Sequence, residues 1–144
     1  MQVIDAEPHQ AESALAECDH VVCLALATEE TENMMNAQAF ERMKRDAVFI
    51  NVSRGNLVDE AALAAALRNG TVAGAAMDVG RALDQMPTPA IAALPNVIAT
   101  PHIGGLTPPA IEAQALDTVS QIAEIVDGQI PHGAVNPEHW TRRF

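Results

Sequence analysis

The sequence predicts an α/β fold, built on a parallel sheet of about four strands with flanking helices. Short continuous apolar runs recur along the chain, and such runs are typical of strands buried on both faces. Between them lie stretches with apolar residues at helical spacing, and this alternation favours parallel strands joined by helices. The chain has 144 residues, 49% of them hydrophobic, which is enough for one domain with a substantial core.

The first half of the chain contains two of the predicted strands. A helix is expected over residues 8–18, and the apolar runs at 21–27 (VVCLALA) and 47–52 (AVFINV) are expected to be strands. Between the two strands, Asn36 is placed to cap a helix that carries Phe40 on its apolar face.

The second half continues the alternation. Asp59 is placed to cap the helix EAALAAALRN, which Gly70 would end. Two more strands are expected at 73–79 (AGAAMDV) and 96–100 (NVIAT). The connection over 81–95 contains several prolines and is expected to be irregular.

A last helix is expected to begin at Thr107, because Pro108 suits the first turn of a helix. Apolar residues follow at helical spacing and form one stripe, which Gly128 ends: Ile111, Ala115, Val119, Ile122 and Val126. The polar tail that follows carries the single Trp of the chain, and we expect it to dock on another part of the protein.

Composition excludes several classes of function. The net charge of −11 repels phosphate backbones and argues against nucleic acid as a partner. No apolar stretch reaches the roughly 18 residues of a membrane span, and the N-terminus has no signal-peptide core. Cys18 and Cys23 fit no redox or zinc motif, which indicates reduced thiols in a cytoplasmic protein. The histidines show no metal-ligand spacing, so no metal site is predicted.

Charged side chains follow three predicted strands at the point where each strand ends. Arg54 follows the second strand, Asp78 ends the third and His102 follows the fourth. The carboxyl ends of parallel strands meet at one edge of a sheet, where ligands of open α/β sheets bind. Each residue also has a structural interpretation by itself, since Arg54 can pair with a surface acid, Asp78 can cap a turn and His102 can be an ordinary loop residue.

Together, the three side chains suggest chemistry on a small acid. A guanidinium such as that of Arg54 matches a carboxylate with its planar fork. An imidazole such as that of His102 can act as an acid or a base near neutral pH. Pro101 ends the strand before His102, and Gly104 and Gly105 after it allow a tight turn or the close approach of a ligand.

Three separated motifs, INVSRGNLVDEAALAAAL, GAAMDV and NVIATPHIGGLT, resemble in their order and spacing the D-isomer-specific 2-hydroxyacid dehydrogenase family. The resemblance extends over residues 12–137, approximately. It implies hydride transfer between a nicotinamide cofactor and a small D-2-hydroxy acid or 2-oxo acid. It further implies that Arg54 binds and polarises the 2-oxo acid, that His102 is the general acid/base, and that Asp78 contacts the nicotinamide side of NAD.

The resemblance also implies a fold, a cofactor and partners. The fold is a Rossmann-like, doubly wound sheet, the cofactor is NAD with NADP not excluded, and the protein is a homodimer. These residues are expected to contact the cofactor: Ala25, Leu26, Ala27, Val52, Ser53, Arg54, Asp78, His102, Gly104 and Gly105.

The largest departure from the family is that the sequence contains no G-x-G-x-x-G. Residues 1–107 are therefore interpreted as the C-terminal part of an NAD-binding domain without its first βαβ unit. Residues 108–144 are interpreted as a helix and tail that pack on a missing substrate domain. We expect such a fragment to be inactive alone; the alternative is a non-catalytic remnant or protein-interaction module.

Two smaller departures concern the site. Where the family has a Glu bonded to its catalytic His, this sequence has Leu83, and the adjacent Asp84 is the candidate replacement. Where the family often has His and Pro after the first of these strands, the sequence has Leu24 and Leu26. Cofactor contacts in that loop are therefore expected to differ.

Overall fold

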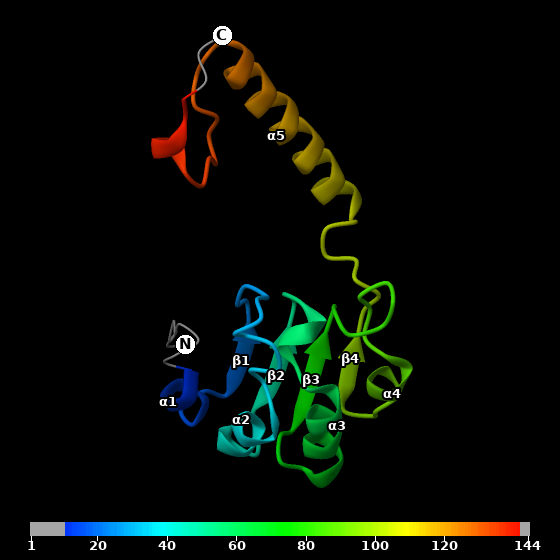
Figure 1. Ribbon diagram of the computed structural model, residues 1–144. Coiled ribbons are helices and arrows are strands. Elements are labelled where there is room, and N and C mark those ends of the chain that lie inside the picture. Colours follow the sequence, from blue (N-terminus) through cyan, green and yellow to red (C-terminus); the bar gives the residue numbers. More distant parts are fainter. Residues whose placement is uncertain (1–10, 142–144) are drawn as a thin grey trace. The chain divides into compact units, whose positions relative to one another are not determined.

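The computed structural model describes residues 11–141 of the chain (Figure 1). The described residues form two compact units, which divide between Ile103 and Gly104. The first unit holds a sheet with its helices, and the second consists of a long helix and the segment that follows it.

The sheet of the first unit has four strands, all parallel, in the order β1-β2-β3-β4. This arrangement confirms the predicted α/β class and the parallel sheet. The strands are β1 (His20–Cys23), β2 (Val48–Asn51), β3 (Gly74–Met77) and β4 (Val97–Ala99). Their carboxyl ends all lie at one edge of the sheet, which Figure 1 shows as the edge with the arrowheads.

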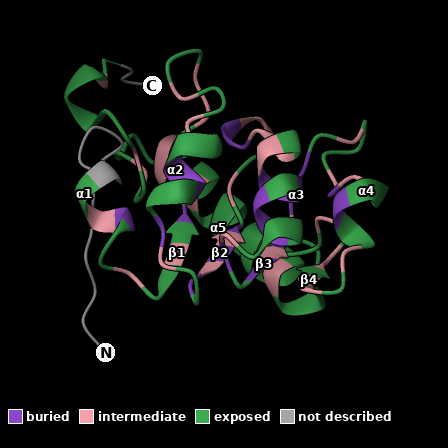
Figure 2. Cartoon of the chain, turned by 90° about the horizontal axis from the view of Figure 1, so that it is seen from below, coloured by how far each residue is buried: buried purple, intermediate pink, exposed green. Residues whose placement is uncertain are grey.

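Helices α2, α3 and α4 all lie on one side of this sheet (Figure 2). Strands joined in consecutive order by right-handed crossovers place their helices on the same face. The helices and short turns of this unit are α1 (Ala11–Leu15), α2 (Ala37–Arg42), the 3-10 turn η2 (Gly55–Leu57), α3 (Glu60–Asn69) and α4 (Pro89–Ala92).

The core lies between the sheet and these helices. Phe49 of β2 is fully buried and meets Phe40 of α2 edge-to-face, with ring centroids 5.4 Å apart. Leu63 and Leu67 of α3 are buried against the same layer. The apolar face predicted for α2 is therefore confirmed, and α3 also turns an apolar face to this layer.

The other face of the sheet is more exposed. Val22, Ile50, Ala76 and Ile98 are register partners across the four strands and form a continuous apolar row. The side chain of Val22 is 50% exposed and that of Ile98 is 72% exposed. The prediction that β1 is buried on both faces is therefore wrong for the described chain, because none of the helices α2 to α4 covers this face.

Local sequence signals at the helix ends are confirmed. Asn36 accepts a hydrogen bond from Ala39 N at 3.1 Å and so caps α2. Asp59 accepts from Ala61 N and Ala62 N, both at 3.0 Å, at the start of α3. Gly70 ends α3 in the left-handed conformation, with φ 66°.

Three element predictions need correction. The strand predicted at 21–27 is shorter in the structure and corresponds only to β1, because the chain leaves the sheet after Cys23. Beyond that point, Leu24 is 70% exposed and Leu26 is 79% exposed. The helix predicted at 8–18 is described only as α1, and residues 8–10 lie outside the described residues. The connection at 81–95 is not wholly irregular, because Pro89 opens the short helix α4.

The second unit contains α5 (Pro108–Val126) and the 3-10 turn η3 (Pro137–His139). Thr107 precedes α5 and Pro108 lies in its first turn, as predicted. None of the residues of α5 is buried, and its apolar stripe is exposed along its length. In the described part of the chain, no helix is both long and apolar enough to cross a membrane.

A histidine ties the segment after α5 back to the helix. His132 Nε2 contacts Asp117 Oδ1 at 2.6 Å, and His132 Nδ1 lies 3.0 Å from both carboxylate oxygens of Glu124. The His132 backbone N–H also donates to Glu124 Oε2 at 2.7 Å. We refer to these three residues as the His132 clasp.

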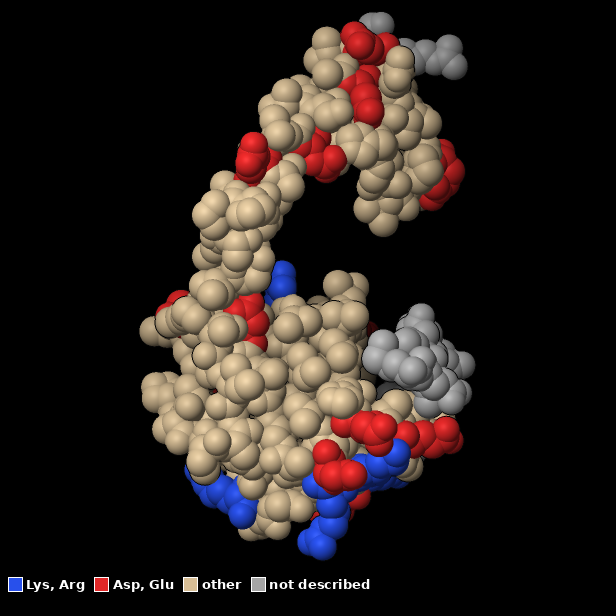
Figure 3. Space-filling view, turned by 180° about the vertical axis from the view of Figure 1, so that it is seen from behind, with Lys and Arg blue, Asp and Glu red and all other residues tan. Residues whose placement is uncertain are grey.

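One group of charged side chains lies at the edge of the sheet where the strands begin. On the face of the first unit seen in Figure 3, acidic and basic residues lie mainly at the lower edge, where the strands begin. The ion pair between Lys44 and Asp19, at 2.8 Å, belongs to this edge. The described part of the second unit contains acidic residues but no Lys or Arg.

Candidate functional site at the carboxyl edge of the sheet

The carboxyl edge of the sheet carries the residues that the sequence singled out. Arg54 follows the end of β2, Asp78 directly follows β3, and His102 follows β4. The parallel sheet brings these ends to one edge, as the order of the elements predicts (Figure 1). Within the described residues, no group of three or more His, Cys, Asp or Glu side chains is arranged to hold a metal ion.

The loop that carries Arg54 is organised by Asn51, a residue that the sequence analysis did not select. Asn51 is the last residue of β2 and is fully buried. Its Nδ2 donates to the Arg54 carbonyl oxygen at 2.9 Å, and its Oδ1 accepts from Ser53 N at 3.1 Å. A buried amide with both groups bonded fixes the backbone. The available signal was a polar amide at the end of an apolar strand.

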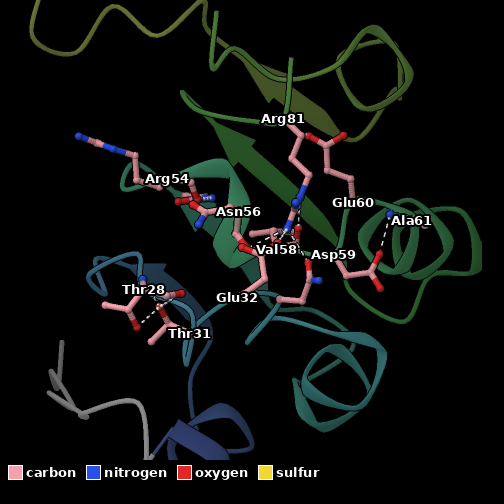
Figure 4. A network of polar contacts seen from close by, with 12 residues as sticks. Thr28, Thr31, Glu32, Arg54, Asn56, Val58, Asp59, Glu60, Ala61 and Arg81 are labelled. Carbon is pink, nitrogen blue, oxygen red and sulfur yellow. Dashed lines mark hydrogen bonds and ion pairs between the residues drawn. The ribbon is translucent and has the colours of Figure 1, made fainter. Parts of the chain in front are cut away.

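The Arg54 side chain itself is exposed. Its Nη1 donates to the Ser53 carbonyl oxygen at 2.7 Å. Figure 4 shows this side chain pointing away from the polar network around Arg81.

Ser53 brings together two of the segments expected to line the cofactor. Its hydroxyl donates to the Ala25 carbonyl oxygen at 2.7 Å and so joins the loop after β2 to the loop after β1. Within the β1 loop, the Thr31 hydroxyl donates to the Leu26 carbonyl oxygen at 2.7 Å. Ala27 is partly buried, whereas the Val52 side chain is 50% exposed.

Gly55 allows the loops after β2 and β3 to touch. A Cβ on Gly55 would lie 2.0 Å from the Gly80 carbonyl oxygen, a distance that no side chain tolerates. Gly80 is itself packed against Pro87, whose Cα would lie 2.4 Å from a Cβ at that position. The glycine of the S-R-G motif is therefore required for packing at this edge.

Asp78 holds the turn that carries His102. Its Oδ1 accepts from the Thr100 hydroxyl at 2.6 Å and from Ile103 N at 3.0 Å. His102 is partly buried, has a φ of 53°, and donates from its backbone N to the Thr100 carbonyl oxygen at 3.0 Å. The left-handed residue in this turn is thus the histidine, and neither Gly104 nor Gly105 has a positive φ.

Asp84, the candidate replacement for the family Glu, is bonded within its own loop. Asp84 is exposed and accepts from Met86 N at 3.2 Å, within its own loop. In the part of the chain that the structure describes, no hydrogen bond links Asp84 to His102, and the Leu83 side chain is fully exposed. Gly104 and Gly105 belong to the second unit, where Gln114 Nε2 donates to the Gly105 carbonyl oxygen at 3.3 Å.

Arg81 forms a second polar network beside the site, which the sequence did not reveal (Figure 4). Its Nη2 donates to Glu32 Oε1 at 2.8 Å and to Asn33 Oδ1 at 2.6 Å. The bond between Arg81 and Glu32 holds the pKa of Glu32 below its usual range. The same nitrogen reaches the Asn56 carbonyl oxygen at 2.8 Å, while Nε donates to the Val58 carbonyl oxygen at 2.9 Å. Arg81 thus links the loops after β1, β2 and β3.

Glu60 connects this network to the first turn of α3. Its Oε1 accepts from Arg81 N at 3.0 Å, and its Oε2 accepts from the Thr88 hydroxyl at 2.7 Å. An acidic residue in the first turn of a helix is also favoured by the helix dipole. The loops around the S-R-G turn are therefore braced from two sides.

The sequence of the chain matches a family model described as "D-isomer specific 2-hydroxyacid dehydrogenase, NAD binding domain" over residues 1–104. The chain belongs to this family. Among curated members, a glyoxylate/hydroxypyruvate reductase B from Erwinia tasmaniensis is 39% identical over 140 residues, which cover 94% of this chain and 42% of that relative. The chain therefore spans less than half the length of this reductase.

Solved structures of the family agree with the fold. An NADPH-dependent glyoxylate/hydroxypyruvate reductase from Sinorhizobium meliloti, in complex with NADP and malonate, superposes with a TM-score of 0.79 and 29% identity, covering 93% of this chain and 42% of that chain. A D-isomer specific 2-hydroxyacid dehydrogenase from Lactobacillus delbrueckii ssp. bulgaricus, in its NAD complex, superposes with a TM-score of 0.74 and 30% identity. This match covers 86% of this chain and 42% of that chain. The Rossmann-like character of the sheet is thereby confirmed.

Proposed function

We propose that this chain forms the nicotinamide side of the active site of an oxidoreductase that interconverts a small D-2-hydroxy acid and its 2-oxo acid. The observation that best supports this is the shared edge of the sheet, where Asn51 fixes the Arg54 loop and Asp78 holds the turn around His102. The family and the names of the relatives support the class of reaction, with glyoxylate and hydroxypyruvate as the first substrates to test.

In this proposal, Arg54 and His102 act on the substrate directly. When bound, the nicotinamide supplies the hydride for the substrate C2 or accepts it. The Arg54 guanidinium binds the substrate carboxylate and stabilises negative charge that grows on the carbonyl oxygen. His102 donates a proton to that oxygen in reduction and takes the proton back in oxidation.

The residues present fit one end of a nicotinamide dinucleotide. The carboxyl edge offers Asp78 and the loop backbone of 25–27 and 52–54 toward such a ligand, whereas the sequence has no G-x-G-x-x-G to hold its pyrophosphate. We propose NAD as the cofactor, with NADP as the alternative, and phosphate contacts from residues outside these 144.

Asp84 is proposed as the replacement for the Glu of the family. Its loop would have to move for this role, since its carboxylate bonds Met86 N in the structure. An Asp84→Asn variant decides the point, because an amide oxygen can still accept from Met86 N but cannot ionise. A shifted pH profile of the reduction supports the role, and an unchanged profile removes it.

We further propose that residues 1–107 are the C-terminal part of the NAD-binding domain and that 108–144 pack on a substrate domain. The exposed apolar stripe of α5 supports the second assignment, since Ile111 is 52% exposed and Val126 is 69% exposed. We also propose that the protein is a homodimer and that it is located in the cytoplasm, which is a reducing compartment. Cys18 and Cys23 are both unpaired, which suits such a compartment.

The decisive experiment uses a chimera, in which these 144 residues replace the matched segment of the Erwinia tasmaniensis reductase. We expect the chimera to oxidise NADH or NADPH when glyoxylate or hydroxypyruvate is added, and the isolated chain to be inactive. A folded chimera without activity on either acid would contradict the proposal. It would favour a non-catalytic remnant or interaction module, which the missing glycine motif also suits.

A further inference from the structure

The turn from Thr100 to Ile103 contains a residue in an uncommon backbone conformation. His102 has a φ of 53°, a region in which residues other than glycine are uncommon. Such a conformation persists only where surrounding contacts hold it, and it is frequent at functional sites. The contacts that hold this turn therefore decide how the imidazole of His102 is presented.

A single carboxylate oxygen spans the turn. Asp78 Oδ1 accepts from the Thr100 hydroxyl at 2.6 Å, before His102, and from Ile103 N at 3.0 Å, after it. A charged acceptor makes both bonds stronger than bonds between neutral groups.

Asp78 and Thr100 are themselves anchored to the sheet. Asp78 N donates to the Asn51 carbonyl oxygen at 3.1 Å, and Thr100 N donates to the Met77 carbonyl oxygen at 2.9 Å. These bonds extend the ladders beyond the ends of β3 and β4. The Asp78 carboxylate thus bonds the turn to residues that are themselves held by the sheet.

We propose that Asp78 is a positioning residue for His102: its carboxylate bridges Thr100 and Ile103 and so fixes the left-handed turn that presents the imidazole to the substrate. This role is separate from the contact with the cofactor that the family resemblance implies. The inference rests on the proposed function only for its kinetic consequence, because the bridge itself is a property of the chain.

The kinetic test uses Thr100→Val in the chimera, with Thr100→Ser as the matched control. Valine has the shape of threonine without the hydroxyl, and the Asp78 side chain itself is unchanged, so any contact it makes with a cofactor is kept. We expect Thr100→Val to lower kcat about tenfold with an unchanged KM for the cofactor, because a misplaced acid/base is costly. Thr100→Ser should restore kcat.

A His102→Ala background separates positioning from other effects. If Asp78 and Thr100 act through His102, adding Thr100→Val to His102→Ala should reduce the rate no further. A full additional loss in that background, or a raised KM for the cofactor with normal kcat, would overturn the proposal.

Amide hydrogen exchange tests the bridge without any activity. In the 144-residue chain, Asp78→Ala should speed exchange at Ile103 N–H about tenfold, since its acceptor is lost. Amides of β2 should exchange as before, which shows that the sheet is intact. Unchanged exchange at Ile103 overturns the proposal. An inactive parent chimera overturns the proposed function instead, and the exchange result then decides the role of Asp78.

Discussion

The side-chain amide of Asn51 donates a 2.9 Å hydrogen bond to the backbone carbonyl oxygen of Arg54. Asn51 is fully buried, so its removal would leave polar groups without partners in the interior. The backbone of Arg54 is thus fixed while its guanidinium is exposed. An exposed guanidinium on a fixed backbone is suited to bind a small anion.

Replacing Arg54 by Lys tests the role of the planar fork. Lysine keeps the charge but loses bidentate geometry, so we expect kcat/KM of the chimera for glyoxylate to fall roughly 10²-fold, or about 2.7 kcal/mol of transition-state stabilisation. Arg68→Lys is the matched control, because Arg68 is exposed in the last turn of α3. Equal kinetics for the two variants would assign Arg54 a structural role.

Replacing His102 by Ala tests proton transfer. General acid–base assistance contributes roughly 10²–10⁴-fold, and we expect a loss of turnover in that range. Cofactor affinity should be nearly intact, because the imidazole acts on the substrate oxygen. His139→Ala, in the exposed turn η3, is the control. A cofactor dissociation constant that rises as steeply as turnover falls would contradict the assignment.

Gly55→Ala should destabilise the first unit by roughly 1–3 kcal/mol through overpacking. The new Cβ would lie 2.0 Å from the Gly80 carbonyl oxygen, and backbone cannot yield as a flexible side chain does. Gly105→Ala is the control, since its Cβ would lie 3.4 Å from the end of the Gln114 side chain. Urea unfolding followed by circular dichroism measures both; equal midpoints would show that the two loops separate readily.

The His132 clasp predicts a pH-dependent attachment of the segment after α5. Hydrogen bonds that the His132 ring donates to Asp117, and then to Glu124, raise the pKa of His132 above its ordinary 6.5. The stabilisation of the clasp by protonated His132 is therefore fully present below about pH 6.5 and is lost as pH rises through the raised pKa. His132 in turn lowers the pKa of Asp117 and of Glu124 from their ordinary 3.8 and 4.5. Their contribution is lost as pH falls through the lowered values, so the clasp is strongest from about 4.5 to 6.5.

Proton NMR of the His132 ring follows this titration. Asp117→Asn should move the midpoint of His132 to lower pH, whereas Glu112→Gln, on the same helix outside the clasp, should leave it in place. The side chains of His132 and Asp117 are exposed, so added salt should weaken the shift. An Asp117→Asn midpoint equal to that of the unmodified chain would refute the clasp in solution.

The 144-residue chain should bind NAD weakly. Without a glycine-rich turn at a helix N-terminus, the pyrophosphate has no site in this sequence, and we expect a dissociation constant no tighter than roughly millimolar, or about −4 kcal/mol. Calorimetric titration measures it, with the Lactobacillus delbrueckii ssp. bulgaricus dehydrogenase, which was solved in its NAD complex, as the positive control. A micromolar constant would show that these residues alone complete a cofactor site.

The sequence by itself determined the order of the elements and the ends of several helices. Asn36, Asp59 and Gly70 act on backbone groups a few residues away, so their effects can be inferred from local sequence. The parallel sheet followed from the alternation of strands and helices. The shared edge of Arg54, Asp78 and His102 followed from the parallel sheet, because the carboxyl ends of parallel strands all lie at the same edge.

Only the tertiary structure decided how that edge is held together. Arg81 bonds Glu32 and Asn56, Asn51 is buried beneath the Arg54 loop, and Asp78 spans the turn around His102. The length of β1 and the exposure of one sheet face were likewise set by which elements pack on the strands. These features depend on contacts between residues far apart in the chain, and hydrophobic periodicity carries no information about which distant polar groups will meet.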